Sequence, residues 1–214
     1  MTNAIGCTEM AAMLRGAAAE IRANHELLGK LDSVGGDGDH GTTMLRAMAK
    51  LEAAVDAASG SDLKSLLYDV GWAILGVDGG ATGPLLGMLF MGMSEAAEGC
   101  DTLDAAALAA AFEAGVAGVR AQTKAQPGDK TMVDALVPAV MAAGCTAESG
   151  GDLLSVLRDA AAAAAAGAAA TKDMQARFGR ARNIKELSIG TPDAGATSVS
   201  FIFAGFLKGM DTNA

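Results

Sequence analysis

Residues 31–44 read LDSVGGDGDHGTTM and join two stretches of helical periodicity. Before them, residues 8–28 place Met10, Leu14 and Ile21 on one broad apolar stripe, which is typical of an amphipathic helix. After them, residues 40–58 are predicted to form a second helix. A glycine-rich loop between two helices that each bury one face indicates a helical bundle.

The rest of the chain repeats this alternation of helix and short loop. Further helices are predicted over residues 63–77, 82–97, 104–122, 131–143, 152–171 and 195–210. Pro138 is expected to kink or interrupt the helix that contains it, because proline has no amide N–H to donate. We find no convincing alternating strand. The prediction is an all-α fold, an antiparallel bundle of about eight helices, with one domain over residues 1–214.

Composition narrows the class of partner. Hydrophobic residues make up 51% of the chain but aromatic residues only 4%, which suits closely packed helices rich in alanine, leucine and methionine. The formal net charge is −9, which argues against a nucleic-acid partner. An acidic protein can hold an anionic nucleotide only if cations intervene.

Cysteine usage and hydropathy predict where the protein works. The three cysteines are odd in number and show no CxxC spacing, which fits reduced thiols in the cytoplasm. The first residues lack the pattern of a signal peptide, and no uninterrupted apolar run reaches the roughly 20 residues that span a bilayer. We therefore expect a cytoplasmic protein without a membrane segment.

Glycine and other turn residues concentrate in four loops, residues 35–41, 76–83, 127–131 and 179–195, and such residues let backbone approach a ligand closely. These loops follow the first, third, fifth and seventh predicted helices. Alternate connections of an antiparallel bundle lie at the same end. The sequence therefore predicts that all four loops meet at a single site.

Three carboxylates dominate the first loop. Asp32, Asp37 and Asp39 repel one another unless a cation lies among them, and carboxylate oxygens are preferred ligands of magnesium. Residues 36–41 formally match GxGxxG, but a helix precedes them where a dinucleotide site requires a strand. A flexible acidic turn without a ligand is the remaining alternative. We predict a magnesium site.

Groups suited to phosphate follow these carboxylates. Gly41, Thr42 and Thr43 begin a helix, whose free N–H groups and dipole favour anions. His40 either touches the nucleotide or caps that helix. In the second loop, Thr82 and Gly83 begin another helix, and Gly83 serves either to clasp a phosphate or to pack helices tightly.

The third and fourth loops add charged candidates. Lys130 either meets phosphate or pairs with Asp129 as a helix cap, and Met132 is a candidate to line a base pocket. Arg177, Arg180 and Arg182 either form a solvated strip or supply an arginine that stabilises charge on a transferring phosphoryl group.

Taken together, these motifs resemble the nucleotide-binding L subunit of dihydroxyacetone kinase, the DAK2 domain family. The resemblance covers about residues 9–206. It rests on four motifs in order: LD-x4-GDGDHG-x-TM, GGATGPLLG, GDKTMVDAL, and MQARFGRA followed by SIGTPDAGATS.

The resemblance implies an eight-helix antiparallel barrel with a nucleotide, ATP or ADP, at one rim. It implies two magnesium ions held by Asp32, Asp37 and Asp39, and Arg180 as the catalytic arginine. The residues it implies around the nucleotide are His40, Gly41, Thr42, Thr43, Thr82, Gly83, Thr123, Met132, Arg180, Asp193, Ala194 and Gly195.

Two departures from the family pattern concern the base and the ribose. Residues 191–195 read TPDAG where the family has His-x-Asp-Pro-Gly, and Thr123 stands where a glycine is expected. They are consistent with a different sugar, such as a four-carbon ketose.

The resemblance also implies a partner, a K subunit that holds the ketose covalently, so that this chain is half of a kinase. Three alternatives within the wider family are a phosphocarrier with permanently bound ADP that a phosphotransferase-system protein rephosphorylates, a nucleotide-sensing regulatory module, and a fatty-acid kinase domain. The GDKTM motif favours the sugar kinases over the last of these.

Overall fold

A computed structural model describes residues 4–58 and 60–211, which form eight α-helices and two short 3-10 helices. The elements are α1 (Cys7–Asp32), α2 (His40–Ala57), α3 (Leu63–Leu75), α4 (Thr82–Ala96), α5 (Ala105–Gln122), α6 (Val133–Glu148), α7 (Leu153–Ala170), η1 (Thr171–Asp173), η2 (Arg180–Ser188) and α8 (Ala194–Asp211). Among the described residues the only β-type pairing is an isolated bridge between Ile5 and Leu103. The predicted all-α class is confirmed.

Aspartate caps fix the start of three helices. Asp62, Asp104 and Asp152 precede α3, α5 and α7, and each carboxylate accepts a backbone N–H from three residues further on, at 2.7–2.8 Å. Such a bond satisfies one of the amides that have no partner within the helix. These starts therefore lie within a residue of where the sequence predicts them.

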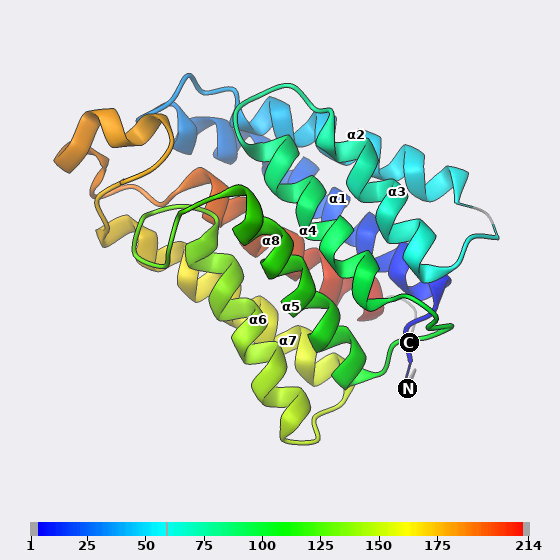
Figure 1. Ribbon diagram of the computed structural model, residues 1–214. Coiled ribbons are helices and arrows are strands. Elements are labelled where there is room, and N and C mark those ends of the chain that lie inside the picture. The colour runs from blue at the N-terminus through cyan, green and yellow to red at the C-terminus, as the bar shows by residue number, and fades with distance from the viewer. Residues whose placement is uncertain (1–3, 59, 212–214) are drawn as a thin grey trace.

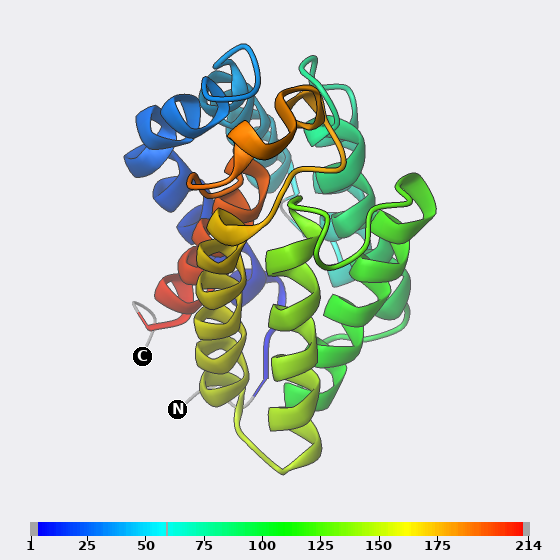
Figure 2. The same ribbon diagram turned by 90° about the vertical axis from the view of Figure 1, so that its left-hand side faces the viewer.

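The eight helices form a closed ring. Each helix packs on the next one in the chain, and α8 packs on α1 (Figure 1). Turning the molecule by 90° brings the connections α1–α2, α3–α4, α5–α6 and α7–α8 into view along the upper end (Figure 2). The antiparallel barrel is confirmed, and the four glycine-rich loops do share one end.

Aromatic side chains fill the interior of the ring. Phe112 of α5 meets Phe203 and Phe206 of α8, with ring centroids 5.3 and 6.1 Å apart. All three are fully buried. Since phenylalanine buries a large apolar area, these three rings anchor the core across the barrel.

The seam between α1 and α8 depends on small residues. A Cβ built on Gly205 would lie 2.4 Å from the backbone of Ala17, and one on Gly16 would lie 2.1 Å from the carbonyl oxygen of Gly205. The two backbones therefore touch directly, which only glycine permits at these positions.

Pro138 does not interrupt its helix, so that part of the expectation is wrong. It is the sixth residue of α6, which continues to Glu148. A non-proline residue here would bond the carbonyl of Asp134. That oxygen instead faces Gly167 of α7, where an added Cβ would lie 2.2 Å away. Close packing by α7 covers the unbonded carbonyl.

One helix is long and apolar enough to span a membrane, judged by length and composition alone. A count of uninterrupted apolar residues, on which the expectation of no membrane segment rests, does not single this helix out. Leu153–Asp173 has a mean hydropathy of 1.4 over its best window, and 33% of that window is buried. The value reflects alanine, and core helices of helical bundles pass the same test. α7 packs against α6 and α8 as part of the ring.

The α1–α8 seam generates a test of packing. We expect Gly205→Ala to lower the free energy of unfolding by about 2 kcal/mol or more, because the new methyl group overlaps backbone that cannot move aside. Gly144→Ala is the matched control, since a Cβ there meets nothing within 4 Å and alanine favours helix by up to about 1 kcal/mol. Urea unfolding measures both. Equal effects of the two substitutions would contradict the direct backbone contact.

Candidate functional site

The four loops at one end line a cavity of about 310 Å³. Each loop and the helix that follows it contribute to the wall: Asp32, Asp39, His40 and Met44; Gly79–Thr82, Leu85 and Leu86; Thr123, Ala125 and Lys130–Val133; Phe178–Ala181, Asp193–Gly195, Ser198 and Val199. Polar groups gather around Asp39, whereas Met44, Leu86 and Val199 are apolar. The cavity thus has a charged end and an apolar end.

The predicted carboxylate cluster forms. One oxygen from each of Asp32, Asp37 and Asp39 lies within 4.8 Å of the others. Asp32 closes the last turn of α1 and Asp39 is the N-cap of α2. Gly36 makes the approach possible, because a Cβ there would lie 2.3 Å from an Asp32 carboxylate oxygen.

The donor set suits magnesium. It consists of carboxylate oxygens, without cysteine or histidine in the group, and hard divalent cations prefer such oxygens. Burial acts to raise the pKa of Asp37, but a backbone hydrogen bond and the Arg180 guanidinium outweigh it, so the pKa falls below 3.8. The Asp37 carboxylate is therefore ionised near neutral pH and available to a cation.

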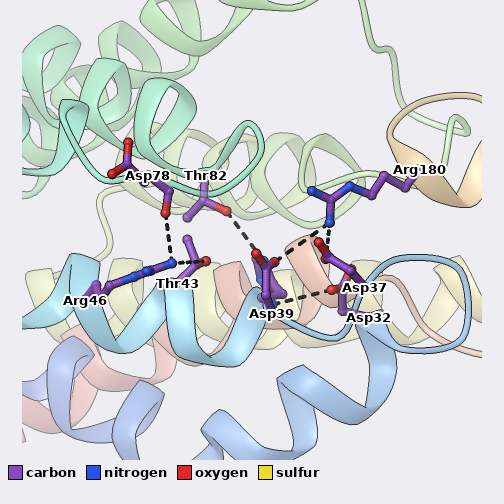
Figure 3. Close-up of polar contacts among 9 residues, drawn as sticks. Asp32, Asp37, Asp39, Thr43, Arg46, Asp78, Thr82 and Arg180 are labelled. Carbon is purple, nitrogen blue, oxygen red and sulfur yellow. Dashed lines mark hydrogen bonds and ion pairs between the residues drawn. The ribbon is translucent and has the colours of Figure 1, made fainter.

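Arg180 points at this cluster (Figure 3). It begins η2, directly after Gly179 at φ +64°, and its guanidinium pairs with Asp37 and lies 4.0 Å from Asp39. Of the three arginines in this region, Arg177 instead pairs with Asp129 at 3.5 Å, and Arg182 is exposed. Only Arg180 lines the cavity, so it alone is placed to act on a bound anion.

His40 is held in one tautomer by a residue absent from the predicted site, Ser198. The Ser198 hydroxyl donates to the carbonyl of Ala194 at 3.0 Å, so its oxygen accepts the Nε2–H of His40 at 2.7 Å. Nδ1 then carries the lone pair and faces the Thr82 hydroxyl at 3.5 Å. Burial lowers the pKa of His40, although Asp32 and Asp39 act in the opposite direction. No local pattern around His40 points to Ser198, which is 158 residues away.

Some residues that are predicted around the phosphate lie outside the lining of this cavity. Gly41, Thr42, Thr43 and Gly83 do not line the cavity. Thr43 accepts a hydrogen bond from Arg46, which also donates to the carbonyl of Asp78 (Figure 3). Gly83 faces the carbonyl of Val77, from which an added Cβ would be 2.6 Å away. This contact favours tight packing for Gly83, whereas Thr82 lines the cavity.

Aspartate side chains hold the backbone of the third loop in place by accepting its N–H groups. Asp134 accepts the N–H of Gly128 and of Thr131, and Asp129 accepts the N–H of Gln126. Lys130 does not pair with Asp129, which was one of the two alternatives for this residue. Its ammonium group instead donates to the backbone carbonyls of Thr171 and Thr191, and its backbone is left-handed at φ +59°. Thr123 and Met132 line the cavity as predicted.

Asp193 closes the cavity from the start of α8, beside Ala194 and Gly195. Its carboxylate accepts the N–H of Ala196 at 2.7 Å. Burial raises the pKa of Asp193 to about 6, against the opposing effects of this hydrogen bond and of Lys130. A carboxyl group with so high a pKa stands out among the acids of this site.

Comparison with known proteins agrees with the fold. The model of the DAK2 domain family matches residues 34–208. The ADP-binding subunit of PEP-dependent dihydroxyacetone kinase 1 from Listeria innocua is 36% identical over 188 residues, which cover 88% of this chain and 89% of that protein. The corresponding subunit from Escherichia coli is 38% identical and covers 83% and 84%. The chain therefore belongs to the DAK2 domain family, as the four motifs predicted.

Longer relatives contain the chain as one part. D-erythrulose kinase from Mycolicibacterium smegmatis is 37% identical over 86% of this chain but only 32% of its own length. The crystal structure of the dihydroxyacetone kinase from C. freundii in complex with AMP-PNP and Mg²⁺ superposes with a TM-score of 0.71 at 25% identity, over 92% of this chain and 33% of that one. The chain thus spans about a third of these proteins. These relatives are phosphotransferases.

The raised pKa of Asp193 predicts a pH dependence of stability. An acid whose pKa is higher in the folded state stabilises the fold when protonated, and that contribution is lost as the pH rises from about 4 through about 6. Allowing for partial exposure, the loss is about 2 kcal/mol.

Urea unfolding of wild type and Asp193→Asn at several pH values measures this loss. Between pH 4 and 7 the unfolding free energy of wild type should fall relative to that of the variant, because the asparagine side chain cannot ionise. A difference that stays constant with pH would show that Asp193 is not the titrating group.

Proposed function

We propose that this chain is the ATP- or ADP-binding subunit of a dihydroxyacetone-type kinase, which transfers a phosphoryl group from a magnesium nucleotide to a small ketose. The observation that carries the proposal is the cluster of Asp32, Asp37 and Asp39 at the charged end of the cavity. The relatives named ADP-binding subunits, and the relative solved with AMP-PNP and Mg²⁺, support the same reading.

The two ends of the cavity suit the two ends of a nucleotide. Met132, Leu86 and Val199 offer an apolar surface for a base, with Thr123, Asp193, Ala194 and Gly195 beside it. The triphosphate or diphosphate then extends towards the carboxylates and the N-termini of α2 and α4, where helix dipoles favour anions. About 310 Å³ lies at the lower end of the volumes usual for ligand sites, and the mouth is open for the phosphates.

Charge neutralisation is the main chemical task of this site. Asp32, Asp37 and Asp39 would hold magnesium, in our proposal two ions, which would offset the charge that develops during transfer. Arg180 exchanges its carboxylate partners for the transferring phosphoryl group and stabilises it. His40, fixed by Ser198, holds the Thr82 hydroxyl at the edge of the site. The chain itself supplies no nucleophile in this scheme, because the acceptor hydroxyl belongs to the ketose.

The ketose requires a second protein. We propose that a K subunit carries it and presents its hydroxyl to the cavity mouth beside Arg180. Residues 1–214 then act as a single nucleotide-binding domain. The three free cysteines are consistent with assembly in the cytoplasm, and no nucleic-acid or membrane partner enters the scheme.

The relatives distinguish two modes of supply. Those that match this chain over most of their own length are PEP- or PTS-dependent ADP-binding subunits, whereas in the erythrulose kinases the matched region is about a third of the protein. This difference favours the second candidate function, in which ADP stays bound as a fixed cofactor and a phosphotransferase-system protein rephosphorylates it. In the first mode ATP exchanges freely.

The metal assignment is tested by removing single carboxylates. Asp37→Ala or Asp39→Ala should weaken binding of magnesium–ADP by about 100-fold or more, while the helical circular dichroism is unchanged. Isothermal titration with and without a chelator measures this. Asp56→Ala is the matched control, because Asp56 lies at the far end of α2 in an exposed pair with Arg15. Full affinity in both site variants would sink the assignment.

The mode of supply is tested on the purified protein. We expect about one ADP per chain to survive dialysis, because a fixed cofactor must dissociate more slowly than it is rephosphorylated. Acid release followed by chromatography quantifies the nucleotide. A chain that emerges empty and exchanges ATP within seconds supports the freely exchanging kinase instead.

A further inference from the structure

Lys130 is buried, charged and not explained by the nucleotide site. Its side chain is only 4% exposed, and it lies between the cavity and a smaller hollow of about 50 Å³ behind it. Its backbone is left-handed, at φ +59°, which is unfavourable for a residue with a Cβ. Such a conformation persists only where the surrounding contacts require it.

The ammonium group bonds two carbonyls that are distant in sequence. Nζ donates to Thr171 O at 2.7 Å and to Thr191 O at 2.5 Å. Thr171 is the C-cap of α7, where carbonyls lack partners within the helix and the dipole favours a cation. Thr191 lies three residues before α8. One cation therefore joins the two ends of the α7–α8 connection.

Further hydrogen bonds hold the two ends of the α7–α8 connection together. We call this closed base, residues 171–172 and 190–193, the neck. The N–H of Gly190 donates to Lys172 O at 2.7 Å, and the N–H of Asp193 donates to the Thr171 hydroxyl at 2.8 Å. Burial lowers the pKa of Lys130, whereas Asp193, Asp173 and Asp134 surround it and act in the opposite direction. The positive charge is thus matched by protein carboxylates.

Beyond the neck, the connection carries Phe178–Ala181, which line the cavity and include Arg180. The third loop supports this segment at a second point, since Asp129 O accepts the N–H of Arg177 at 3.1 Å. η2 also packs on the first loop, where a Cβ on Gly35 would lie 2.8 Å from Ala181, whereas Leu187 is 79% exposed. The position of Arg180 therefore depends on these contacts together with those at the base of the connection.

We propose that Lys130 is a positioning residue, whose ammonium closes the neck of the α7–α8 connection and so holds Arg180 against the nucleotide cavity. The effect on nucleotide binding rests on the proposed function, whereas the effect on the connection does not. This role differs from direct contact with phosphate, because two of the three N–H groups of the ammonium are already bonded to protein carbonyls.

Hydrogen exchange of the nucleotide-free protein, read by mass spectrometry, tests the role. Lys130→Met keeps the aliphatic stem but removes the ammonium donor from Thr191 O and from Thr171 O, which keeps only the N–H of Met174 at 3.1 Å. We expect amides of residues 172–192 to exchange about tenfold faster or more, while those of α1 and α4 change less than twofold. Lys124→Met is the matched control, because it removes an exposed lysine from the same loop. If the methionine variant fails to fold, Lys130→Gln replaces it. Glutamine retains an N–H donor, so residues 172–192 should exchange faster than in wild type but by less than the tenfold expected for methionine.

Affinity for magnesium–ADP, measured on the same variants, separates the outcomes. We expect it to fall about tenfold in Lys130→Met. Lower affinity with unchanged exchange at residues 172–192 overturns the proposal in favour of direct phosphate contact. Faster exchange with unchanged affinity overturns the link to Arg180. If wild-type protein binds no magnesium–ADP, the proposed function fails, and the exchange rates alone decide the role of Lys130.

Discussion

Mutual repulsion among Asp32, Asp37 and Asp39 is the constraint around which the open end of the barrel is arranged. Three carboxylates within 4.8 Å of one another are unfavourable unless a positive charge lies among them. Arg180 supplies one such charge from a segment more than 140 residues along the chain. A magnesium nucleotide would supply more. The cluster therefore makes the site dependent on cations, in a chain whose net charge is −9.

Holding these charges in place requires a rigid frame. The helix ring provides one through backbone contacts, as between Gly205 and Ala17, and through the aromatic core around Phe112. The loops are then tied to the frame and to each other by polar groups. Arg46 fixes the loop that follows α3, and Lys130 joins both ends of the connection that follows α7. The glycines permit close approach, and these cations remove the freedom that glycine would otherwise leave.

Local patterns predicted some site residues well and others poorly. Asp32, Asp37 and Asp39 were predictable because they are close in sequence and glycine separates them. Thr43 and Gly83 occur in similar glycine-rich contexts, yet in this structure Thr43 bonds Arg46 and Gly83 packs on Val77. Composition near a helix start does not specify which side faces a ligand. That orientation depends on the rotation of each helix against its neighbours.

The sequence by itself determined the eight helices, the gathering of alternate loops at one end and the carboxylates at the charged end. All of these follow from short-range periodicity, capping chemistry and antiparallel parity. Only the tertiary structure decided the partners of Lys130, the tautomer of His40 through Ser198, and the uninterrupted helix at Pro138. Each of these depends on a contact between segments that are far apart in the chain, such as Asp134 with Gly167. Packing creates such contacts, and no local pattern records them.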